Sequence, residues 1–280
     1  MRGVRHLAAV VFLATLAAVL ICVSPGLAAS DDWVKPSLPA SDDQLRSAVQ
    51  NPLADLISLP FQNNTNFGIG PHDRTQNTLN IQPVYPVDIG EWLLVNRVIL
   101  PVVYQPDVAS DSGGEWGLGD TTWSFFFVPP AKGFTWGVGP IALIPTSTKD
   151  ETGAGEWGLG ATGVVLWQSP KWTIGGLASN LWSVGADEGD DINVFTGQYF
   201  INYNLDNGWY LTSAPIMSAN WEAPDGEEWT IPVGGGAGKL LRIGKLPVNT
   251  SVQAFTMVEK PTGGPDWQLR VQVQLLFPKK

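Results

Sequence analysis

Amide side chains recur at every second position in the last part of this chain, together with one arginine. Gln268, Gln272 and Gln274 alternate with apolar residues between positions 266 and 277, and Arg270 occupies the same face. A period of two indicates a β-strand with one polar and one apolar face. Amides can hydrogen-bond carboxylate, phenol or hydroxyl groups without adding charge, whereas a guanidinium stays protonated and is costly to bury unpaired. The polar face therefore predicts a wall that binds or passes small solutes.

The same alternation in other stretches extends this wall, provided that the chain forms a closed barrel whose last strand pairs with its first. The side chains expected to line the lumen of that barrel are Gln62, Asn64, Asn66, Asn80, Gln82, Arg97, Gln198, Asn202, Asn204, Gln253, Gln268, Arg270, Gln272 and Gln274. In a narrow lumen the positive charge of Arg270 favours anions. We expect Arg270 to face water or to pair with an acid such as Glu259 on the neighbouring strand.

Residues for covalent or metal chemistry are scarce. Of the two histidines, His6 lies in the N-terminal leader and His72 in a predicted loop, which excludes a serine–histidine pair on a strand. The carboxylates cluster in loops. The acidic run at 187–191 could bind calcium, but a solvated acidic loop is the interpretation we prefer. The sequence therefore predicts no enzyme, no catalytic residue, no metal site and no cofactor.

The chain begins with the features of a secretory signal peptide, which we predict to span residues 1–29. Two arginines precede an apolar run from residue 7 to residue 23, and a Pro-Gly break precedes the alanines at the cleavage site. An uncleaved anchor is disfavoured because this run is shorter than the roughly 20 residues that a spanning helix needs. Lipidation at Cys22 is disfavoured because Ile21 is too large for the position before such a cysteine.

Cleavage there would remove the only cysteine of the chain, so that no disulfide or thiolate site could form. The formal net charge of the whole chain is −10, and it becomes more negative when the signal peptide, which contains two arginines, is cleaved off. An acidic protein of this kind argues against nucleic acid as a partner.

Residues 30–53 are predicted to form a periplasmic spacer with a short helix, and residues 54–280 an outer-membrane β-barrel. The helix signal is a capping box that begins at Ser41, followed by apolar residues at helical spacing and a stop at Pro52. The rest of the chain divides into about twelve antiparallel strands separated by Gly, Pro, Asn and Asp clusters. These strands are expected near residues 55–67, 76–87, 92–105, 116–129, 134–146, 157–168, 172–184, 192–205, 209–221, 229–243, 247–259 and 266–277.

Loop lengths and aromatic residues favour a membrane barrel over a soluble barrel that buries its apolar face. The connections after the odd-numbered strands tend to be longer and richer in acids than those after the even-numbered strands. This asymmetry is typical of outer-membrane barrels, in which the short turns are periplasmic. Aromatic residues near both ends of the strands predict two girdles at the membrane interfaces. Their predicted members are Trp92, Trp116, Trp136, Trp157, Trp172, Trp209, Trp229, Trp267 and Phe277.

Several segments are similar to those of a known protein family. They read NPLADLISLPFQNNTNFGIGP, TQNTLNIQPVYP, RVILPVVYQP, GLGDTTWSFFF and GGPDWQLRVQVQLLFPKK. From about Asn51 onward the chain resembles bacterial outer-membrane β-barrels that are described as transporter-like, often under the misapplied name "neuromedin U", and that look related to barrels associated with phenol meta-cleavage degradation. The resemblance implies the barrel fold but brings no functional residues. One departure is that residues 278–280 follow Phe277, so the terminal aromatic that assembly machinery reads is not the last residue.

Together these patterns predict a channel or uptake protein in the outer membrane of a Gram-negative-type bacterium. Its solutes would be small and neutral or weakly anionic, including aromatic or hydrophobic ones. The alternative is a non-conducting structural or surface-interaction barrel whose acidic outer loops matter. The expected partners are outer-membrane lipid and lipopolysaccharide, the barrel assembly machinery and the solute.

Overall fold

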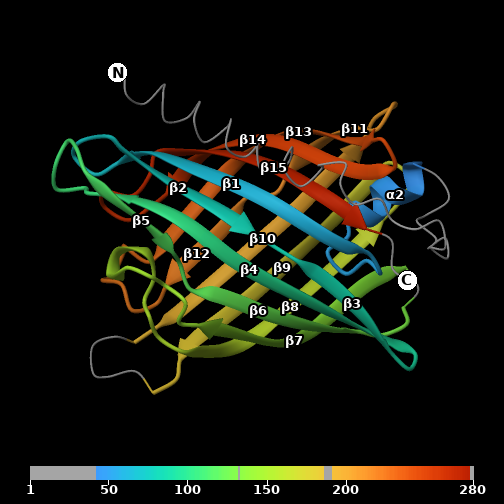
Figure 1. The fold of residues 1–280 in the computed structure, drawn as a ribbon, viewed down its shortest axis with the longest axis horizontal. Coiled ribbons are helices and arrows are strands. Elements are labelled where there is room, and N and C mark those ends of the chain that lie inside the picture. The colour runs from blue at the N-terminus through green and yellow to red at the C-terminus, as the bar shows by residue number, and fades with distance from the viewer. Residues whose placement is uncertain (1–41, 132, 186–190, 278–280) are drawn as a thin grey trace. The chain divides into compact units, whose positions relative to one another are not determined.

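The computed structural model describes residues 42–131, 133–185 and 191–277, so the predicted signal peptide lies outside the described residues. This part of the chain is an antiparallel β-barrel with one short α-helix near its N-terminal side, as the sequence predicts (Figure 1). Fifteen strand segments form twelve barrel strands, because three barrel strands are each split into two segments. The split strands are β2 with β3, β5 with β6, and β11 with β12.

The elements follow one another around the barrel, and nearly all connections are hairpins. Their bounds are α2 (Asp42–Val49), β1 (Ile57–Ile69), β2 (Arg74–Ile81), β3 (Val84–Ile89), β4 (Trp92–Pro106), β5 (Gly114–Leu118), β6 (Thr121–Val128), β7 (Phe134–Ile144), the short helix η1 (Asp150–Thr152), β8 (Gly158–Gln168), β9 (Trp172–Ser183), β10 (Asn193–Asn204), β11 (Trp209–Ser213), β12 (Ile216–Asn220), β13 (Trp229–Ile243), β14 (Leu246–Glu259) and β15 (Trp267–Phe277).

Pairing of the last strand with the first closes the barrel. The β1–β15 register runs from Ile57 opposite Phe277 to Phe67 opposite Trp267, without a bulge. The rings of Phe67 and Trp267 stack with centroids 4.0 Å apart and planes 11° from parallel. This register also places Gln62 directly opposite Gln272, so the amides of the two strands lie on one face.

The two faces of the barrel wall differ as the period-two pattern predicts. Outward-facing Val165, Leu211 and Val252 are about half exposed, whereas inward-facing Thr212 and Gln253 are buried. An apolar band on the outside and polar groups within are what a barrel in lipid requires, because lipid cannot hydrogen-bond a polar side chain. Among the described residues, no helix is long and apolar enough to cross a membrane.

The sequence predicts continuous strands at 76–87, 116–129 and 209–221, but each of these is divided into two segments in the structure. Two splits coincide with Pro83 and Pro215, which have no N–H to donate to a neighbouring strand. At the third split Asp120 accepts hydrogen bonds from the amides of Ser147 and Gly155, which belong to the loop between β7 and β8. At this split, hydrogen bonds to the loop therefore take the place of pairing with a neighbouring strand.

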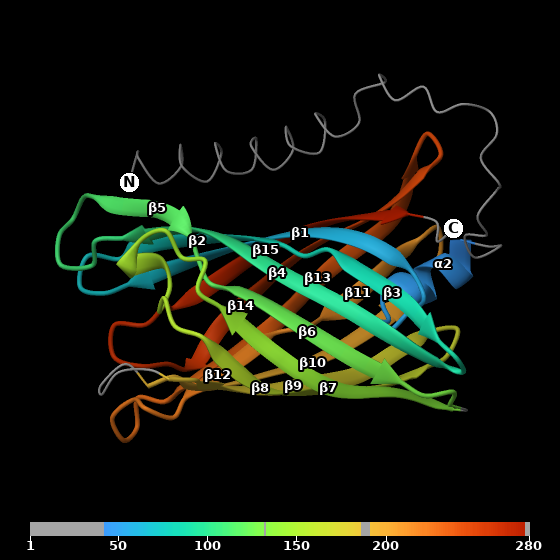
Figure 2. The same cartoon turned by 60° about the horizontal axis from the view of Figure 1, so that its bottom comes forward.

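The two ends of the barrel differ in the length of their connections (Figures 1 and 2). The long-loop end carries residues 107–113, 145–157, 184–185 with 191–192, 221–228 and 260–266 between strands, although its connection at 70–73 is a tight turn. The other end, which we call the short-turn end, carries turns such as 90–91, 169–171 and 244–245. The predicted asymmetry is therefore present, with 70–73 as an exception.

Neighbouring loops at the long-loop end are joined by hydrogen bonds. The Thr262 hydroxyl donates to Glu227 Oε1 at 2.6 Å, and the Thr262 amide donates to Glu227 Oε2. These two bonds favour the carboxylate form and lower the pKa of Glu227 below its usual value. Asp107 likewise accepts from the Ala109 amide and the Ser110 hydroxyl, which lowers the pKa of its carboxyl group.

Helix α2 lies in the mouth of the barrel at the short-turn end (Figures 1 and 2). Its Leu45 is fully buried against Leu56, Leu240 and Leu276. Arg46 Nη1 donates to the carbonyl of Leu205 at 2.8 Å. Both apolar and polar contacts therefore hold the helix against the barrel wall.

Candidate functional site

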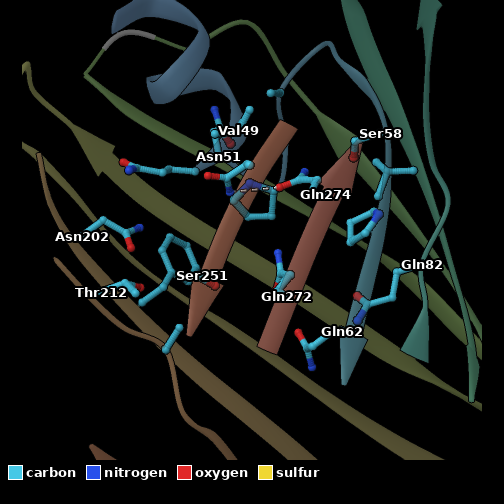
Figure 3. Close-up of a pocket in the computed structure, with 18 of the residues that line it drawn as sticks. Val49, Asn51, Ser58, Gln62, Gln82, Asn202, Thr212, Ser251, Gln272 and Gln274 are labelled. Carbon is cyan, nitrogen blue, oxygen red and sulfur yellow. Dashed lines mark hydrogen bonds between the residues drawn. The ribbon is translucent and has the colours of Figure 1, made fainter. Parts of the chain in front are cut away.

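A cavity of about 180 Å³ lies in the lumen next to α2 (Figure 3). Ala48 and Val49 of α2, and Gln50 directly after the helix, line it at the short-turn end. On β15 the lining includes Gln274 and Gln272 and stops one inward-facing position before Arg270. The cavity therefore occupies the half of the lumen nearer the short turns.

One side of the cavity is polar. Figure 3 shows Gln62, Gln272 and Ser251 directed into the same space from neighbouring strands. Some of the lining amides are held by other side chains, since Tyr210 donates its hydroxyl to Asn249 Oδ1 at 3.0 Å. Such a wall offers a solute several donors and acceptors and no net charge.

Another part of the lining is apolar and extends beyond Phe200, which the alternation in its strand predicts to face inward. Val84, Leu177 and Phe200 line the cavity and belong to a larger cluster inside the barrel. The buried core of that cluster is formed by Leu53, Val95, Phe126, Val128, Val164, Leu166 and Phe200. These residues fill the lumen beside the cavity. The interior is therefore divided into an apolar half and a polar half.

Arg97 is the one arginine that lines the cavity. It lies on β4, and its Nη2 donates to Gln82 Oε1 at 2.6 Å. Gln82 lies at the split between β2 and β3. Among the described residues that line the cavity there is no aspartate or glutamate, so the positive charge of Arg97 faces neutral groups.

Arg270 forms a barrier beyond the cavity and is only 2% exposed. Its Nε donates to Asn64 Oδ1 at 2.8 Å, its Nη2 to Gln268 Oε1 at 3.2 Å and its Nη1 to the Ala214 carbonyl at 2.6 Å. The guanidinium also lies 5.0 Å from the centre of the Phe255 ring. We name Arg270, Asn64, Gln268 and Phe255 the Arg270 barrier.

Glu259 is not the partner of Arg270, contrary to one alternative that the sequence left open. Glu259 is exposed, whereas the three contacts of Arg270 within the described part of the chain are to neutral oxygens. The split between β11 and β12 removes the Ala214 carbonyl from the sheet, and it accepts from both Arg270 and Gln198 Nε2, the latter at 3.1 Å. The Ala214 amide is satisfied in turn by Gln253 Oε1 at 3.0 Å.

A ladder of amides continues from the barrier toward the long-loop end. Gln268 donates to Asn66, Asn66 donates to Gln76, and Gln76 donates to Gln105, with distances of 2.8, 2.8 and 2.6 Å. The ladder crosses from β15 over β1 and β2 to β4. Gln76 and Gln105 are not among the residues predicted to line the lumen, although both occupy polar positions on their strands.

The predicted lumen residues fall into separate groups in the structure. Those that line the cavity are Gln62, Gln82, Arg97, Gln198, Asn202, Gln253, Gln272 and Gln274. Those in the barrier or the ladder are Asn64, Asn66, Gln268 and Arg270. Asn204 instead accepts a hydrogen bond from Gln50 at the helix, and Asn80 lies half-buried opposite Gln62. The lining residues that the prediction omitted include Ser58, Tyr210, Thr212, Asn249 and Ser251.

The predicted girdle residues lie mainly on the outer surface near the strand ends. Trp92, Trp116, Trp136, Trp157, Trp172, Trp209 and Trp267 are all exposed. Lys239 lies 4.9 Å from the centre of the Trp209 ring, a pairing suited to an interface. Trp229 and Phe277 are half-buried, and Trp229 packs edge-on against Trp221, which the prediction omitted.

No cluster for metal or acid–base chemistry is present in the described ranges. Among these residues no group of three or more His, Cys, Asp or Glu is close enough to hold a metal ion. His72 is exposed in the turn at 70–73. The acidic run at 187–191, weighed above as a calcium loop, lies outside the described residues except for Asp191.

Solved structures include several barrels that are similar to this chain. The COG4313 outer membrane channel from Pseudomonas putida F1 matches with a TM-score of 0.60 at 16% identity, covering 79% of this chain and 94% of that one. The CymD monoaromatic hydrocarbon channel matches with a TM-score of 0.42 at 8% identity, covering 86% and 91%. The outer membrane phospholipase dimer from Salmonella typhi matches with a TM-score of 0.40 at 13% identity, covering 85% and 98%.

No protein-family model matches the chain, and no curated protein matches it. At 16% identity, the likeness to the Pseudomonas putida structure shows the fold alone. The chain therefore has the fold of an outer-membrane β-barrel.

Proposed function

We propose that this chain is an outer-membrane channel or uptake protein for small neutral or weakly anionic solutes in a Gram-negative-type bacterium. The observation that carries the proposal is the cavity lined by amides and hydroxyls inside a barrel with an apolar exterior. The likeness in fold to a protein described as an outer membrane channel supports the same assignment. Outer-membrane lipid, lipopolysaccharide and the barrel assembly machinery are the partners that such a barrel would meet.

The size of the cavity limits the solute. Pockets for drug-sized ligands measure roughly 300–1,000 Å³, so a cavity of about 180 Å³ suits a smaller molecule. At roughly 30 Å³ for each water, it would hold about six waters. A single ring or a short chain with one polar group fits these dimensions.

Passage through the lumen requires movement at both ends of the cavity. Helix α2 lines the cavity at the short-turn end, and the Arg270 barrier follows it on the other side. Gln50, directly after α2, is bonded near the cavity to Asn204 and Thr173, at 2.9 and 3.0 Å. Individual hydrogen bonds of this kind contribute only about 0.5–1.5 kcal/mol, so the helix can be displaced without unfolding the barrel.

The second candidate is a barrel that conducts nothing. The observation that favours it is the fixation of α2, since Leu45 is fully buried among leucines of three other segments. If α2 never leaves the mouth of the barrel, the polar cavity holds only water and no solute passes through it. The acidic long loops would then be the functional surface.

Swelling of proteoliposomes separates the two candidates. Purified protein, shown to be folded by a mobility shift between unboiled and boiled samples, should admit a pentose and exclude a tetrasaccharide. Gln50→Ala should admit the pentose faster, because it loosens α2, whereas Lys239→Gln on the outer wall should match the parent. If neither the parent nor Gln50→Ala admits the pentose, the non-conducting barrel becomes the correct account.

A further inference from the structure

The two arginines inside the barrel differ in how many of their donors are already used. All three nitrogens of Arg270 donate to protein oxygens, and this side chain does not line the cavity. Arg97 lines the cavity and donates from Nη2 to Gln82 alone within the described part of the chain. A guanidinium has five N–H donors in a fixed fork. Arg97 therefore has donors left for a ligand.

The charge of Arg97 has no carboxylate beside it. The cavity lining contains no acid among the described residues. Two ion pairs, Lys149 with Glu115 and Lys260 with Asp266, lie at the long-loop end, away from the cavity. A charge that loses water without gaining a counter-ion is unfavourable. A guanidinium matches a carboxylate through two parallel hydrogen bonds, so a small carboxylate is the ligand that best completes this site.

The apolar side of the cavity lies next to this charge. Val84 is the cross-strand partner of Arg97, and Leu177 and Phe200 line the same cavity. All three pack on the apolar cluster inside the barrel. A ligand held at Arg97 by its charged end would place an apolar body against this surface and remove that surface from water.

We propose that the cavity binds small amphipathic monocarboxylates, with the carboxylate on Arg97 and the apolar body against Val84, Leu177 and Phe200. The proposal deepens the proposed channel function and rests on it. It assigns solute recognition to Arg97 and leaves Arg270 as a brace across the lumen. The cavity volume of about 180 Å³ accommodates one aromatic ring with its carboxylate but not a long acyl chain.

Calorimetric binding of benzoate to the folded protein in detergent tests the proposal, with benzamide as the neutral probe of the same shape. The parent should bind benzoate at least about tenfold more tightly than benzamide, the ratio expected for one charge-assisted hydrogen-bonded pair. Arg97→Gln should remove this preference, and Arg97→Lys should keep part of it. Lys239→Gln, which removes the same charge from the outer wall, should bind benzoate as the parent does.

Equal binding of the two probes to the parent, or unchanged benzoate binding by Arg97→Gln, would overturn the proposal. If Arg97→Gln does not fold, Phe200→Leu provides the second test, because it should weaken benzoate binding about threefold or more and leave acetate unaffected. Equal losses for benzoate and acetate in this variant would also contradict the site. Binding in detergent does not depend on conduction, so a barrel that conducts without binding benzoate refutes only the carboxylate site.

Discussion

Arg270 Nη1 donates to the carbonyl oxygen of Ala214 at 2.6 Å, which joins the last barrel strand to the split between β11 and β12. In the cyclic order of the barrel, β13 and β14 separate these two partners. The contact therefore crosses part of the lumen instead of following the sheet. It makes Arg270 both a structural brace and an obstacle to passage.

Arg270→Gln should therefore raise conductance and lower stability together. The shorter side chain cannot reach Ala214, whose carbonyl keeps only the hydrogen bond from Gln198 Nε2 at 3.1 Å, and the lost charge-assisted bond costs about 1.5–3 kcal/mol. Loss of the positive charge should also shift the reversal potential in a salt gradient away from anion preference. Asp111→Asn in a long loop is the control, because salt screens an exposed charge within roughly 10 Å. If the variant conducts like the parent, and its folded band on a gel is lost at the same heating temperature as that of the parent, the contact between Arg270 and Ala214 has no role.

Leu45→Ala should loosen α2 without unfolding the barrel. Leu45 is fully buried, and large-to-small changes of this kind cost about 2–5 kcal/mol, here confined to the docking of the helix. Amide hydrogen exchange in residues 42–49 should accelerate, while exchange in β13 and β14 stays as in the parent. Val252→Ala, which shortens a half-exposed side chain on the outer wall, should leave the helix protected. Global loss of protection in Leu45→Ala would mean that α2 is an integral part of the barrel fold.

The contact between Glu227 and Thr262 should make loop order depend on pH. The folded pKa of Glu227 lies below its reference value of 4.5, because the hydrogen bonds from Thr262 favour the carboxylate. For a carboxyl group with a lowered folded pKa, the stabilisation is complete above the unfolded pKa and is lost as pH falls through the folded pKa. Exchange of amides 260–266, corrected for intrinsic rates, should thus be slow at neutral pH and accelerate as pH falls through this lowered pKa. Glu227→Gln should exchange quickly both above and below this pKa; pH-independent protection in the parent would contradict this account.

The orientation of the barrel can be tested with single cysteines, since the only native cysteine is Cys22 in the predicted leader. Asp111→Cys lies in a long loop and Pro170→Cys in a short turn, and both positions are exposed. An impermeant thiol reagent added to whole cells should label the first and spare the second. Labelling of Pro170→Cys alone would place the long loops in the periplasm.

The strands of this protein were predictable because alternation of polar and apolar residues is a local signal. The closure of β15 on β1 followed from the same signal, since both strands carry amides on one face. The face of β9 could not be assigned from the sequence, and the structure turns Thr173 and Leu177 inward and Trp172 outward. Small residues between them hide the alternation, because a glycine has no side chain to assign to a face.

The features that position the candidate site were less predictable because they depend on distant contacts. The split at Ala214 is signalled locally by Pro215, but nothing near it identifies Arg270 as its partner. The alternation in β10 predicts that Phe200 faces inward, but the contribution of β6 to the apolar cluster was hidden, because Phe125, Phe126 and Phe127 are consecutive and remove the alternation there. Arg97 was expected to face the lumen, and it lines the cavity, whereas its place beside an apolar wall required the structure.

Single-channel recording of the purified, heat-modifiable protein in planar bilayers tests the central claim most directly. The account predicts small discrete openings for the parent, because the lumen holds a polar cavity behind a narrow barrier. Openings of Arg270→Gln should be larger, since the brace to Ala214 is gone. Bilayers that stay silent with the parent, with Arg270→Gln and with Leu45→Ala would contradict the account and leave a structural barrel.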